Sequence, residues 1–445
     1  PGVVPETDDG ERLYSSNSLL TYTLKTMLSR GWLRFDGSEW SPSIPDNQRT
    51  WQTRAREVLR LLSNDDRLYL GRELGRRYTA GTRFEAFDVR ADLIPLDKLG
   101  YVREHFWRFR PRVVFNAAFF LLEHDDFFSH HSGLGEAYNL HVKDGTVLRP
   151  PLYRRAAFYQ TADRRWQAGD FSMTDLTITL PDGTLLVPQG IKTEGTPFVL
   201  NPNHHADVAV YTRTLGLANS GRPSHHTPAA QDRVEYTIVD RRVVGRKTGG
   251  SLDIPQNGFV LSFSRSANPS SAFRDETLSR VRYGFARKAH RGMKQAIQAG
   301  PMLLKDGRPV IVAGSLSDEQ FWPTPPGHAG LSDIGVVPTD YPDDVDQTRA
   351  GRMGIGVDAE NHLIVVAVPG TERGAQRPGV DTVGATLVEL AVLLAEEGAV
   401  DAINLDGGGS TQLFYMGGSA TVPGNRYGMP GVHFERMVSS VGVIY

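Results

Sequence analysis

A stretch near the carboxyl end of the chain brings together residue types that could bind an anion and carry out acid–base or nucleophilic chemistry. Asn404 can donate and accept hydrogen bonds, and Asp406, two residues later, supplies a carboxylate. After these come residues with bare backbone or a hydroxyl group: Gly407, Gly408, Gly409, Ser410 and Thr411. Main-chain N–H groups of glycine can approach an anion without obstruction by a side chain. The alternative is an Asp-Gly hairpin turn without a chemical role.

The segment before this stretch predicts a helix followed by a strand. Thr386 and Glu389 have the spacing of a capping box, and Gly398 stands where a helix C-cap belongs. Between them, apolar residues recur on one helical face: Leu387, Leu390, Ala391 and Leu394. Residues 400–405 are largely apolar and predict a short strand, which the run of glycines must end. This strand would fix Asn404 and Asp406 near its carboxyl end.

Further strands are predicted nearer the middle of the chain. Residues 84–93 alternate between apolar and polar types, and residues 113–115 form a second strand that Asn116 closes. Asn116 is a candidate ligand residue, the alternative being an asparagine that satisfies a turn. Asp-Gly pairs between strand-like segments predict three hairpins, at Asp144-Gly145, Asp182-Gly183 and Asp306-Gly307.

The composition excludes several classes of protein. A net charge of −2 over 445 residues gives no indication of a nucleic-acid partner. The absence of cysteine excludes disulfides, thiolate nucleophiles and metal sites built on cysteine. No run of about 18 apolar residues is present, so we expect no membrane-spanning helix. A hydrophobic content of 40% is enough for a substantial core, so the chain reads as a globular protein.

Three segments carry weaker signals. Residues 1–80 show helical spacing at 16–29 and 50–62, and they predict a small helical N-terminal extension. A polar loop holds ligand types that would suit zinc, but their spacing matches no established motif, so we expect no metal and no cofactor. These loop residues are His124, Asp125, Asp126, His130 and His131. Residues 216–247 and 264–294 are rich in Gly, Pro, Ser and Arg and predict long loops.

Short motifs along the chain resemble those of the phosphodiester glycosidase family, in the same order. The first are N-A-A-F-F at 116–120, V-K-D-G-T-V-L-R-P-P at 142–151, R-R-A-A at 154–157 and D-V-A-V-Y-T at 207–212. They continue with I-P-Q-N-G-F-V-L-S at 254–262, A-I-Q-A-G-P-M-L-L-K-D-G at 296–307, R-M-G-I-G-V-D at 352–358, A-I-N-L-D-G-G-G-S-T at 402–411 and E-R-M-V-S-S-V-G-V at 435–443. One departure is Ala117-Ala118, where the family usually has two glycines.

The resemblance runs from about residue 85 to the C-terminus and implies the fold. It implies a mixed α+β fold, with largely antiparallel sheets and covering helices, and the strand periodicity independently supports a strand-rich chain. We therefore expect two parts, the helical extension at residues 1–80 and a catalytic domain at residues 81–445. The resemblance also favours a secreted or periplasmic protein, although this chain opens on P-G-V-V-P without a signal peptide.

The resemblance also implies the residues of a site, among them Asn116 as a ligand of a sugar or a phosphate. Arg155 and Arg352 match arginines of the family and are candidate ligands for an anion, the alternative being structural or surface ion pairs. Glu435 and Arg436 precede the last predicted strand, 437–445, and would complete the charged set. We expect Asp406 to act as nucleophile or general base, with Glu435 as a second carboxylate.

The expected activity is hydrolysis of a sugar–phosphate (phosphodiester) bond or a related glycosidic bond, with a carbohydrate substrate that carries an anionic group. One alternative is an enzyme that hydrolyses or transfers an ordinary glycosidic bond of an exopolysaccharide or other glycan, because Ala117 and Ala118 depart from the family pattern. A second alternative is a sugar-binding module without catalytic activity. The combination of Asn404, Asp406 and several arginines favours an enzyme over such a module.

Overall fold

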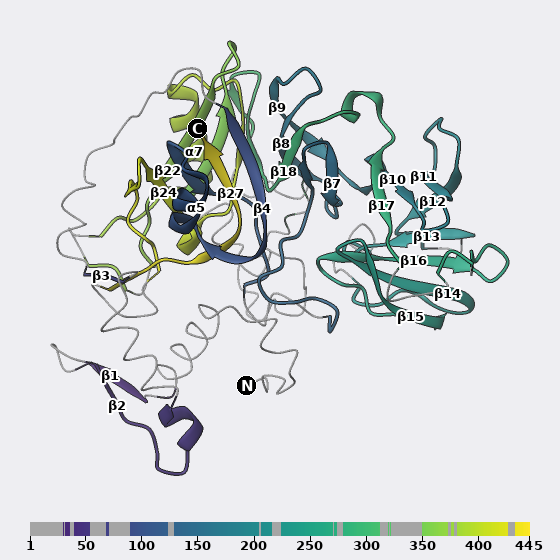
Figure 1. Cartoon of the computed structure of the whole chain (residues 1–445), viewed down its shortest axis with the longest axis horizontal. Helices are drawn as coiled ribbons and strands as arrows, with labels where there is room; N and C mark the ends of the chain where they lie inside the picture. Colours follow the sequence, from purple (N-terminus) through teal and green to yellow (C-terminus); the bar gives the residue numbers. More distant parts are fainter. Residues whose placement is uncertain are drawn as a thin grey trace.

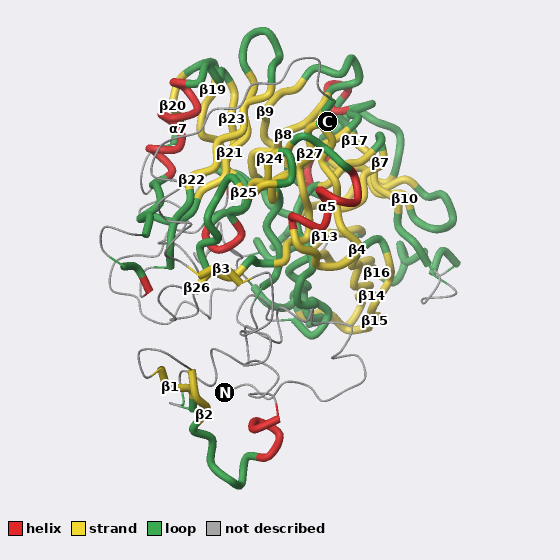
Figure 2. The backbone as a smooth tube through the Cα atoms, turned by 60° about the vertical axis from the view of Figure 1, so that its left-hand side comes forward, coloured by secondary structure: helices red, strands yellow, loops and turns green. Residues whose placement is uncertain are grey.

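The structure is a computed structural model that describes the larger part of the chain. The described residues are 30, 32–35, 40–53, 68–70, 90–122, 129–203, 206–215, 224–269, 271–273, 279–311, 319, 321, 349–372, 375–377, 381–425 and 432–445. Most of them lie in sheets or loops, and the described helices are few and short (Figure 2). The fold is therefore richer in strands than the mixed α+β fold that we predicted.

Three five-stranded sheets are antiparallel throughout. Their strands contain four residues of the predicted site: Asn116, Arg155, Arg352 and Asn404. The β4–β27 sheet has the order β25 (Gly418–Ser419), β24 (Leu413–Tyr415), β5 (Val113–Asn116), β27 (Met437–Ile444), β4 (Ala91–Tyr101). The β21–β23 sheet has the order β20 (Arg308–Pro309), β19 (Met302–Lys305), β23 (Asp401–Asn404), β21 (Arg352–Val357), β22 (Leu363–Val368). The β8–β18 sheet has the order β7 (Thr146–Arg149), β6 (His141–Lys143), β18 (Gln295–Gln298), β8 (Arg155–Gln160), β9 (Trp166–Phe171).

An eight-stranded sheet lies at the end of the molecule opposite α5 and α7 in the view of Figure 1. Its order is β15 (Arg242–Gly250), β14 (Ala229–Val239), β16 (Gly258–Ser264), β13 (Val208–Tyr211), β12 (Thr196–Leu200), β11 (Leu185–Pro188), β10 (Leu176–Thr179), β17 (Arg282–Phe285). The pairs β11–β12 and β12–β13 are parallel. Two short pairs complete the described strands: β1 (Leu33–Phe35) with β2 (Trp40–Pro42), and β26 (Val432–Phe434) with β3 (Leu68–Leu70).

Two helices cover the outer faces of two facing sheets. The β4–β27 and β21–β23 sheets share one hydrophobic core, to which they contribute Phe115, Ile444, Met353, Ile355 and Ile403. The opposite face of the first sheet packs on α5 (Val102–Phe109), and that of the second packs on α7 (Leu387–Glu396). The order is thus helix, sheet, core, sheet, helix. Partly buried Phe119 packs against three of the hydrophobic cores and so lies where the layers meet.

Helix α7 forms as its capping residues predict. Thr386 Oγ1 accepts the amide hydrogen of Glu389 at 3.2 Å, and Glu389 Oε2 accepts that of Thr386 at 2.9 Å. Gly398 follows the helix with a φ of +94°, a conformation that side chains other than glycine rarely adopt. The four predicted apolar positions, Leu387, Leu390, Ala391 and Leu394, are all fully buried. Each buried leucine contributes about 1.5–3 kcal/mol to folding, so packing as well as capping stabilises this helix.

The predicted strands and hairpins around the site are also confirmed. Residues 400–405 contain β23, residues 113–115 lie in β5 and residues 437–445 contain β27. The Asp-Gly pairs lie between antiparallel strands: Asp144-Gly145 between β6 and β7, Asp182-Gly183 between β10 and β11, and Asp306-Gly307 between β19 and β20. Of the strand predicted at 84–93, β4 contains the end, and residues 84–89 lie outside the described residues.

The prediction of a long loop at 216–247 is wrong, because β14 and most of β15 lie there. These strands pair as a hairpin whose two-residue turn is Asp240-Arg241, with φ angles of +47° and +64°. Such a turn usually contains glycine, and its absence removed the signal for a hairpin. The segment 264–294 similarly contains β17. In the predicted N-terminal extension, the described part includes β1, β2 and β3, and residues 49–53 are helical, as predicted for the start of the helix at 50–62. Residues 16–29 and 54–62 lie outside the described residues.

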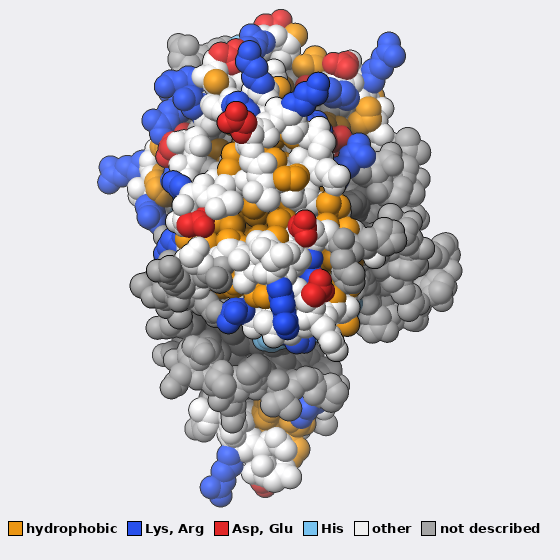
Figure 3. All heavy atoms as spheres, turned by 90° about the vertical axis from the view of Figure 1, so that its right-hand side faces the viewer, with side chains coloured by type: hydrophobic (Ala, Val, Ile, Leu, Met, Phe, Trp, Pro, Cys, Tyr) orange, Lys and Arg blue, Asp and Glu red, His pale blue; other side chains and the backbone are white. Residues whose placement is uncertain are grey.

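On the face of the molecule that Figure 3 shows, basic side chains gather along the upper rim, interspersed with acidic ones, while hydrophobic side chains occupy the middle. This mixture of signs accords with the net charge of −2. No helix among the described residues is long and apolar enough to cross a membrane.

Candidate active site

The loop between β23 and β24 is held at both ends by one side chain from a third strand. Asn116, at the end of β5, donates from Nδ2 to the main-chain oxygen of Asp406 at 2.6 Å. Asn116 Oδ1 accepts the amide hydrogen of Gln412 at 3.0 Å. Asn116 is fully buried, so both bonds are shielded from water. Its amide group therefore fixes the loop 406–412, and this finding agrees with the alternative for Asn116, a residue that satisfies a turn.

The glycines pack against other backbone segments as well as shaping the loop. The amide of Gly408 donates to the oxygen of Gly351 at 2.7 Å, and those of Ser410 and Thr411 donate back within the loop. Gly408 has a φ of +56° and begins a short 3-10 helix, Gly408–Ser410. Among the predicted main-chain donors, the amides of Gly407 and Gly409 have no acceptor in the described part of the chain.

Arg436 lies against this loop. A Cβ atom on Gly409 would stand 2.7 Å from Arg436 Nη2, so glycine is needed for the close approach of the guanidinium group. Arg436 Nη2 donates to Asn425 Oδ1 at 2.7 Å, and the main-chain oxygen of Arg436 accepts from Gln412 Nε2 at 2.7 Å. The structure thus brings Arg436 beside the loop that follows Asp406. Asp406 itself is partly exposed.

Several buried polar atoms along this loop have no hydrogen-bond partner among the described residues. They are Asn404 Oδ1, Ser410 Oγ, Thr411 Oγ1, Gln412 Oε1 and Arg436 Nε. Unpaired buried polar atoms are uncommon in folded proteins, because each one loses its hydrogen bonds with water without compensation. A group of five such atoms next to a partly exposed carboxylate is typical of a ligand site.

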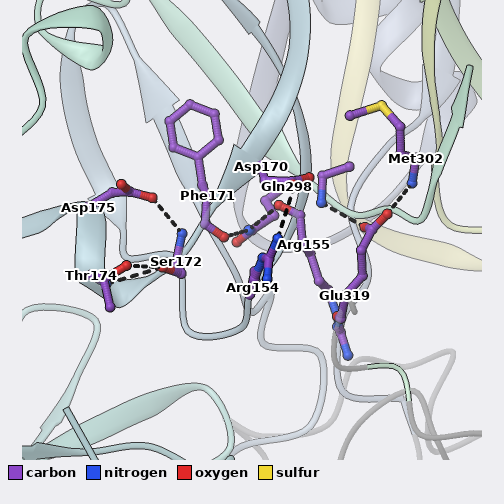
Figure 4. Close-up of polar contacts among 11 residues, drawn as sticks. Arg154, Arg155, Asp170, Phe171, Ser172, Thr174, Asp175, Gln298, Met302 and Glu319 are labelled. Carbon is purple, nitrogen blue, oxygen red and sulfur yellow. Dashed lines mark hydrogen bonds and ion pairs between the residues drawn. The ribbon is translucent and has the colours of Figure 1, made fainter. Parts of the chain in front are cut away.

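Asn404 links this loop to the β8–β18 sheet. Its Nδ2 donates to the oxygen of Gly300 at 3.0 Å, and its amide donates to the oxygen of Pro301, also at 3.0 Å. A Cβ atom on Gly300 would stand 2.7 Å from Glu319 Oε2. The carboxylate of Glu319 accepts the amide hydrogens of Ala156 at 2.8 Å and of Met302 at 2.6 Å (Figure 4). Glu319 therefore joins the start of β8 to the start of β19.

Glu319 is titratable near neutral pH. Burial raises its pKa to about 7, although the amide donors of Met302 and Ala156 and the charge of Arg155 act in the opposite direction. A carboxyl group with such a pKa can hold or release a proton at physiological pH. Glu319 was missed by the sequence reasoning, because the surrounding S-D-E-Q-F carries no motif or periodic signal.

Arg155 is fully buried against two aromatic rings, and its side chain lies beside Glu319 (Figure 4). Its Cζ lies 4.4 Å from the ring centroid of Tyr153 and 3.9 Å from that of Phe321. Its Nε donates to the main-chain oxygen of Glu319 at 3.3 Å. Burial lowers the pKa of Arg155, while Tyr138, Tyr153 and Glu319 oppose that shift. Gln298 Nε2 donates to the main-chain oxygens of Arg155 and Phe171, both at 2.8 Å, and so fixes the start of β8.

The two other charged residues of the predicted site lie in structural contacts. Arg352 is buried at the start of β21 and donates from Nε to the oxygen of Ala385 at 3.0 Å, just before α7. Glu435 is 2% exposed, and its Oε2 lies 3.2 Å from Nε of Arg103 on α5. Ala117 and Ala118 are buried in the core, where the oxygen of Ala117 accepts the amide hydrogen of Asp406 at 2.9 Å.

This geometry can now be compared with known proteins. Residues 232–445 match the phosphodiester glycosidase family. The match confirms the predicted resemblance over that part of the chain. It includes Asp406, the three glycines and Arg436, whereas Asn116 and Arg155 lie before it. No curated protein matches the sequence.

Three solved structures are similar to this chain. A hypothetical protein from Synechocystis is 20% identical, with a TM-score of 0.44, and the match covers 81% of this chain and 57% of that one. A putative exported protein from Burkholderia pseudomallei is 20% identical, with a TM-score of 0.45 and coverage of 80% and 71%. The catalytic domain of zebrafish N-acetylglucosamine-1-phosphodiester alpha-N-acetylglucosaminidase, auto-inhibited by its pro-peptide, is 17% identical, with a TM-score of 0.26 and coverage of 71% and 89%. The chain thus spans little more than half the length of the Synechocystis protein.

Part of the predicted metal loop is described. Possible ligand atoms of His130, His131 and Asp253 lie within 4.8 Å of one another, as do those of Asp358, Glu360 and His362. His124, Asp125 and Asp126 lie outside the described residues. Arg213 Nη2 lies 3.8 Å from Asp253 Oδ1. A guanidinium group at this distance would repel a metal cation bound to the same carboxylate.

Proposed function

We propose that this protein is a glycosidase that cleaves a sugar from a phosphate, or a related glycosidic bond, at the loop 404–412. The family match supports the reaction class, and the local geometry supports an anionic group in the substrate. Asp406 is the proposed nucleophile or general base. Arg436 and the amides of Gly407 and Gly409 are the proposed ligands of the anion.

One observation carries this proposal. Five buried polar atoms without partners in the described residues gather on the segment 404–412 and Arg436, beside a carboxylate that is partly exposed. A loop with only a structural role would pair these atoms internally. A sugar phosphate offers hydroxyl groups and anionic oxygens that could satisfy both the donors and the acceptors of this set.

The proposed roles follow from the chemistry of the bond. Departure of a phosphate leaves an oxocarbenium-like sugar, which a nearby carboxylate can stabilise or attack. Phosphate is a good leaving group, so binding of its negative charge matters more than strong acid assistance. Arg436 is suited to that task, because guanidinium groups bind phosphate oxygens in pairs. Four further residues remain candidate ligands of the substrate: Arg155, Asn404, Ser410 and Thr411.

A second carboxyl group is better supplied by Glu319 than by Glu435. Glu319 is partly exposed and has a pKa of about 7. It lies beside Arg155 and beside Gly300, whose main-chain oxygen accepts a hydrogen bond from Asn404. Glu435 is almost fully buried and pairs with Arg103. We therefore propose that Glu319 holds or releases the proton that the reaction requires, and that Glu435 and Arg352 support the site structurally.

The proposal is tested by comparing three classes of compound with the full chain. The protein would be incubated with a sugar 1-phosphodiester or the matched aryl glycoside, and release of product would be measured. Binding of the free sugar would be measured separately. We expect release from the phosphodiester at a kcat/KM clearly above that for the aryl glycoside. Preference for the aryl glycoside would support the ordinary glycosidic bond instead. Saturable binding of sugar without turnover of either compound would support a binding module and contradict the proposal.

A further inference from the structure

Arg213 is a buried arginine whose guanidinium group makes one ion pair but no hydrogen bond with the described residues. It follows β13 in a turn, and its side chain is 1% exposed. None of Nε, Nη1 and Nη2 has a hydrogen-bond partner among the described residues. The nearest acid is Asp253, whose Oδ1 lies 3.8 Å from Nη2 and itself lacks a hydrogen bond. Burial lowers the pKa of Arg213 to about 10, so the group remains charged at neutral pH.

Another buried arginine shows how this fold satisfies such a group. Arg233 is 3% exposed and donates from Nε to Ser262 Oγ at 3.0 Å and from Nη2 to Ser262 O at 2.6 Å. Its Nη1 donates to Ala206 O. All three nitrogens of Arg233 thus have acceptors, whereas none of those of Arg213 does. The difference indicates that Arg213 is not placed for the stability of the chain alone.

The turn that carries Arg213 is fixed by neighbouring side chains. Asn201 Nδ2 donates to the hydroxyl oxygens of Thr212 and Thr214, both at 2.9 Å, and Asn201 Oδ1 accepts the amide hydrogen of Thr212 at 2.8 Å. The carboxylate of Asp253 is held on its other side, because its Oδ2 lies 3.0 Å from His130 Nδ1. The arginine is therefore presented from a rigid turn, and a positioned charge of this kind binds a ligand at a low entropic cost.

Arg213 shares a neighbour, Tyr153, with the buried Arg155. Tyr153 interacts electrostatically with Arg213, and the face of the same ring lies 4.4 Å from Arg155 Cζ. Burying charge without hydrogen bonds is costly, and an anion at this place would recover that cost through charge-assisted bonds.

We infer that Arg213 forms an anion subsite that recognises an acidic group, a carboxylate or a phosphate, on the sugar ring of the substrate. This inference rests on the proposed function, and it makes the substrate an acidic sugar rather than a neutral one. A guanidinium fork fits the paired oxygens of either group. Arg436 binds the anion at the bond that is cleaved, and Arg213 binds the second one.

The test is equilibrium binding of three sugars to the full chain by calorimetry: glucuronate, glucose 6-phosphate and uncharged glucose. We expect one or both charged sugars to bind at least 10-fold more tightly than glucose. Arg213→Met should weaken binding of the charged sugar by roughly 10- to 100-fold, the loss expected for charge-assisted hydrogen bonds, and leave glucose binding unchanged. Arg213→Lys, which keeps the charge and loses the fork, should lie between. Preference between the two acids identifies the carboxylate or the phosphate as the ligand.

Thermal unfolding without ligand provides the structural control. Arg213→Met should lower the unfolding temperature only slightly, because Arg213 makes a single ion pair at 3.8 Å and Asp253 keeps its contact with His130. Arg233→Met should unfold at a clearly lower temperature. Equal destabilisation by both substitutions, or charged sugars that bind no better than glucose, would overturn the inference. Binding through Arg213 without any turnover would instead contradict the proposed function and leave the subsite intact.

Discussion

Asn116 and Asp406 are joined by a hydrogen bond of 2.6 Å from Asn116 Nδ2 to the main-chain oxygen of Asp406, although 290 residues separate them in the chain. The other end of the same amide group holds Gln412. One side chain from β5 thus sets the position of the loop that carries the proposed catalytic carboxylate. The loop is held in place by these two hydrogen bonds and not by contacts within itself alone.

Asn116→Ala should therefore lower both stability and activity. Loss of two buried hydrogen bonds leaves an amide and a carbonyl group unsatisfied, which we expect to cost about 2–4 kcal/mol in the free energy of unfolding. Turnover should fall because Asp406 is no longer fixed. Denaturant unfolding and kcat/KM on the same sample check both results. Asn116→Asp keeps the acceptor for Gln412 but loses the donor to Asp406, and it should not restore turnover. If Asn116→Ala is as stable as the unsubstituted protein, the two hydrogen bonds of Asn116 do not hold the loop in place.

Gly409→Ala should displace Arg436. The new methyl group would overlap Asn425 Oδ1, which accepts from Arg436 Nη2, and would stand 2.7 Å from Arg436 Nη2 itself, so both side chains must move away from the loop. We expect a loss of turnover of at least 10-fold, the effect of about 1.4 kcal/mol in the barrier. Gly418→Ala is the matched control, because a Cβ atom there meets only Tyr415 O at 3.6 Å. Equal activity of the two variants would remove Arg436 from the proposed site.

The carboxyl group of Glu319 should make stability depend on pH. Its pKa in the folded protein, about 7, lies above the ordinary value of 4.5, so the folded state retains a proton that the unfolded state releases between these values. Stability supplied by this group is complete below about pH 4.5 and is lost as the pH rises toward 7. Glu319→Gln should flatten the unfolding temperature over that range, whereas the exposed Glu360→Gln should not. A slope that persists in Glu319→Gln would assign it to other groups.

Glu435→Gln separates a structural from a catalytic role. Because Glu435 pairs with Arg103 at 3.2 Å and is nearly buried, its neutralisation should cost about 1–3 kcal/mol of stability. Turnover per folded molecule should stay close to that of the unsubstituted protein. The reverse pattern, a stable variant without turnover, would restore Glu435 as the second catalytic carboxylate. Urea unfolding and active-site titration of the same preparation distinguish the two patterns.

The elements that present the site could be predicted from sequence because their signals are local. The Thr386–Glu389 capping box and Gly398 fix the ends of α7 within a few residues, and two-residue Asp-Gly turns fix three hairpins. The hairpin β14–β15 was missed for the converse reason, since Asp240-Arg241 adopts the same kind of turn without glycine.

The contacts of the site could not be predicted in the same way, because they join distant segments. Nothing near Asn116 indicates that it bonds both ends of a loop around residue 406, and nothing near Glu435 indicates Arg103. Arg213 stands one residue after the motif D-V-A-V-Y-T, which was recognised, yet its burial without partners is visible only in three dimensions. Sequence therefore gave the candidate types, and the fold decides which of them meet.

The most direct measurement is kcat for Asp406→Asn on a sugar 1-phosphodiester, with Asp182→Asn as the control. Asp182 also precedes a glycine, but its Oδ1 only accepts the amide hydrogen of Thr184 in an exposed hairpin. Asparagine has the shape of aspartate, and the main-chain bonds of residue 406 with Asn116 and Ala117 do not depend on its side chain, so the Asp406→Asn protein should fold. We predict a kcat lower by roughly 10²- to 10⁴-fold for Asp406→Asn and an unchanged kcat for Asp182→Asn. Near-normal turnover by a folded Asp406→Asn protein would contradict the proposal that this carboxylate carries the reaction.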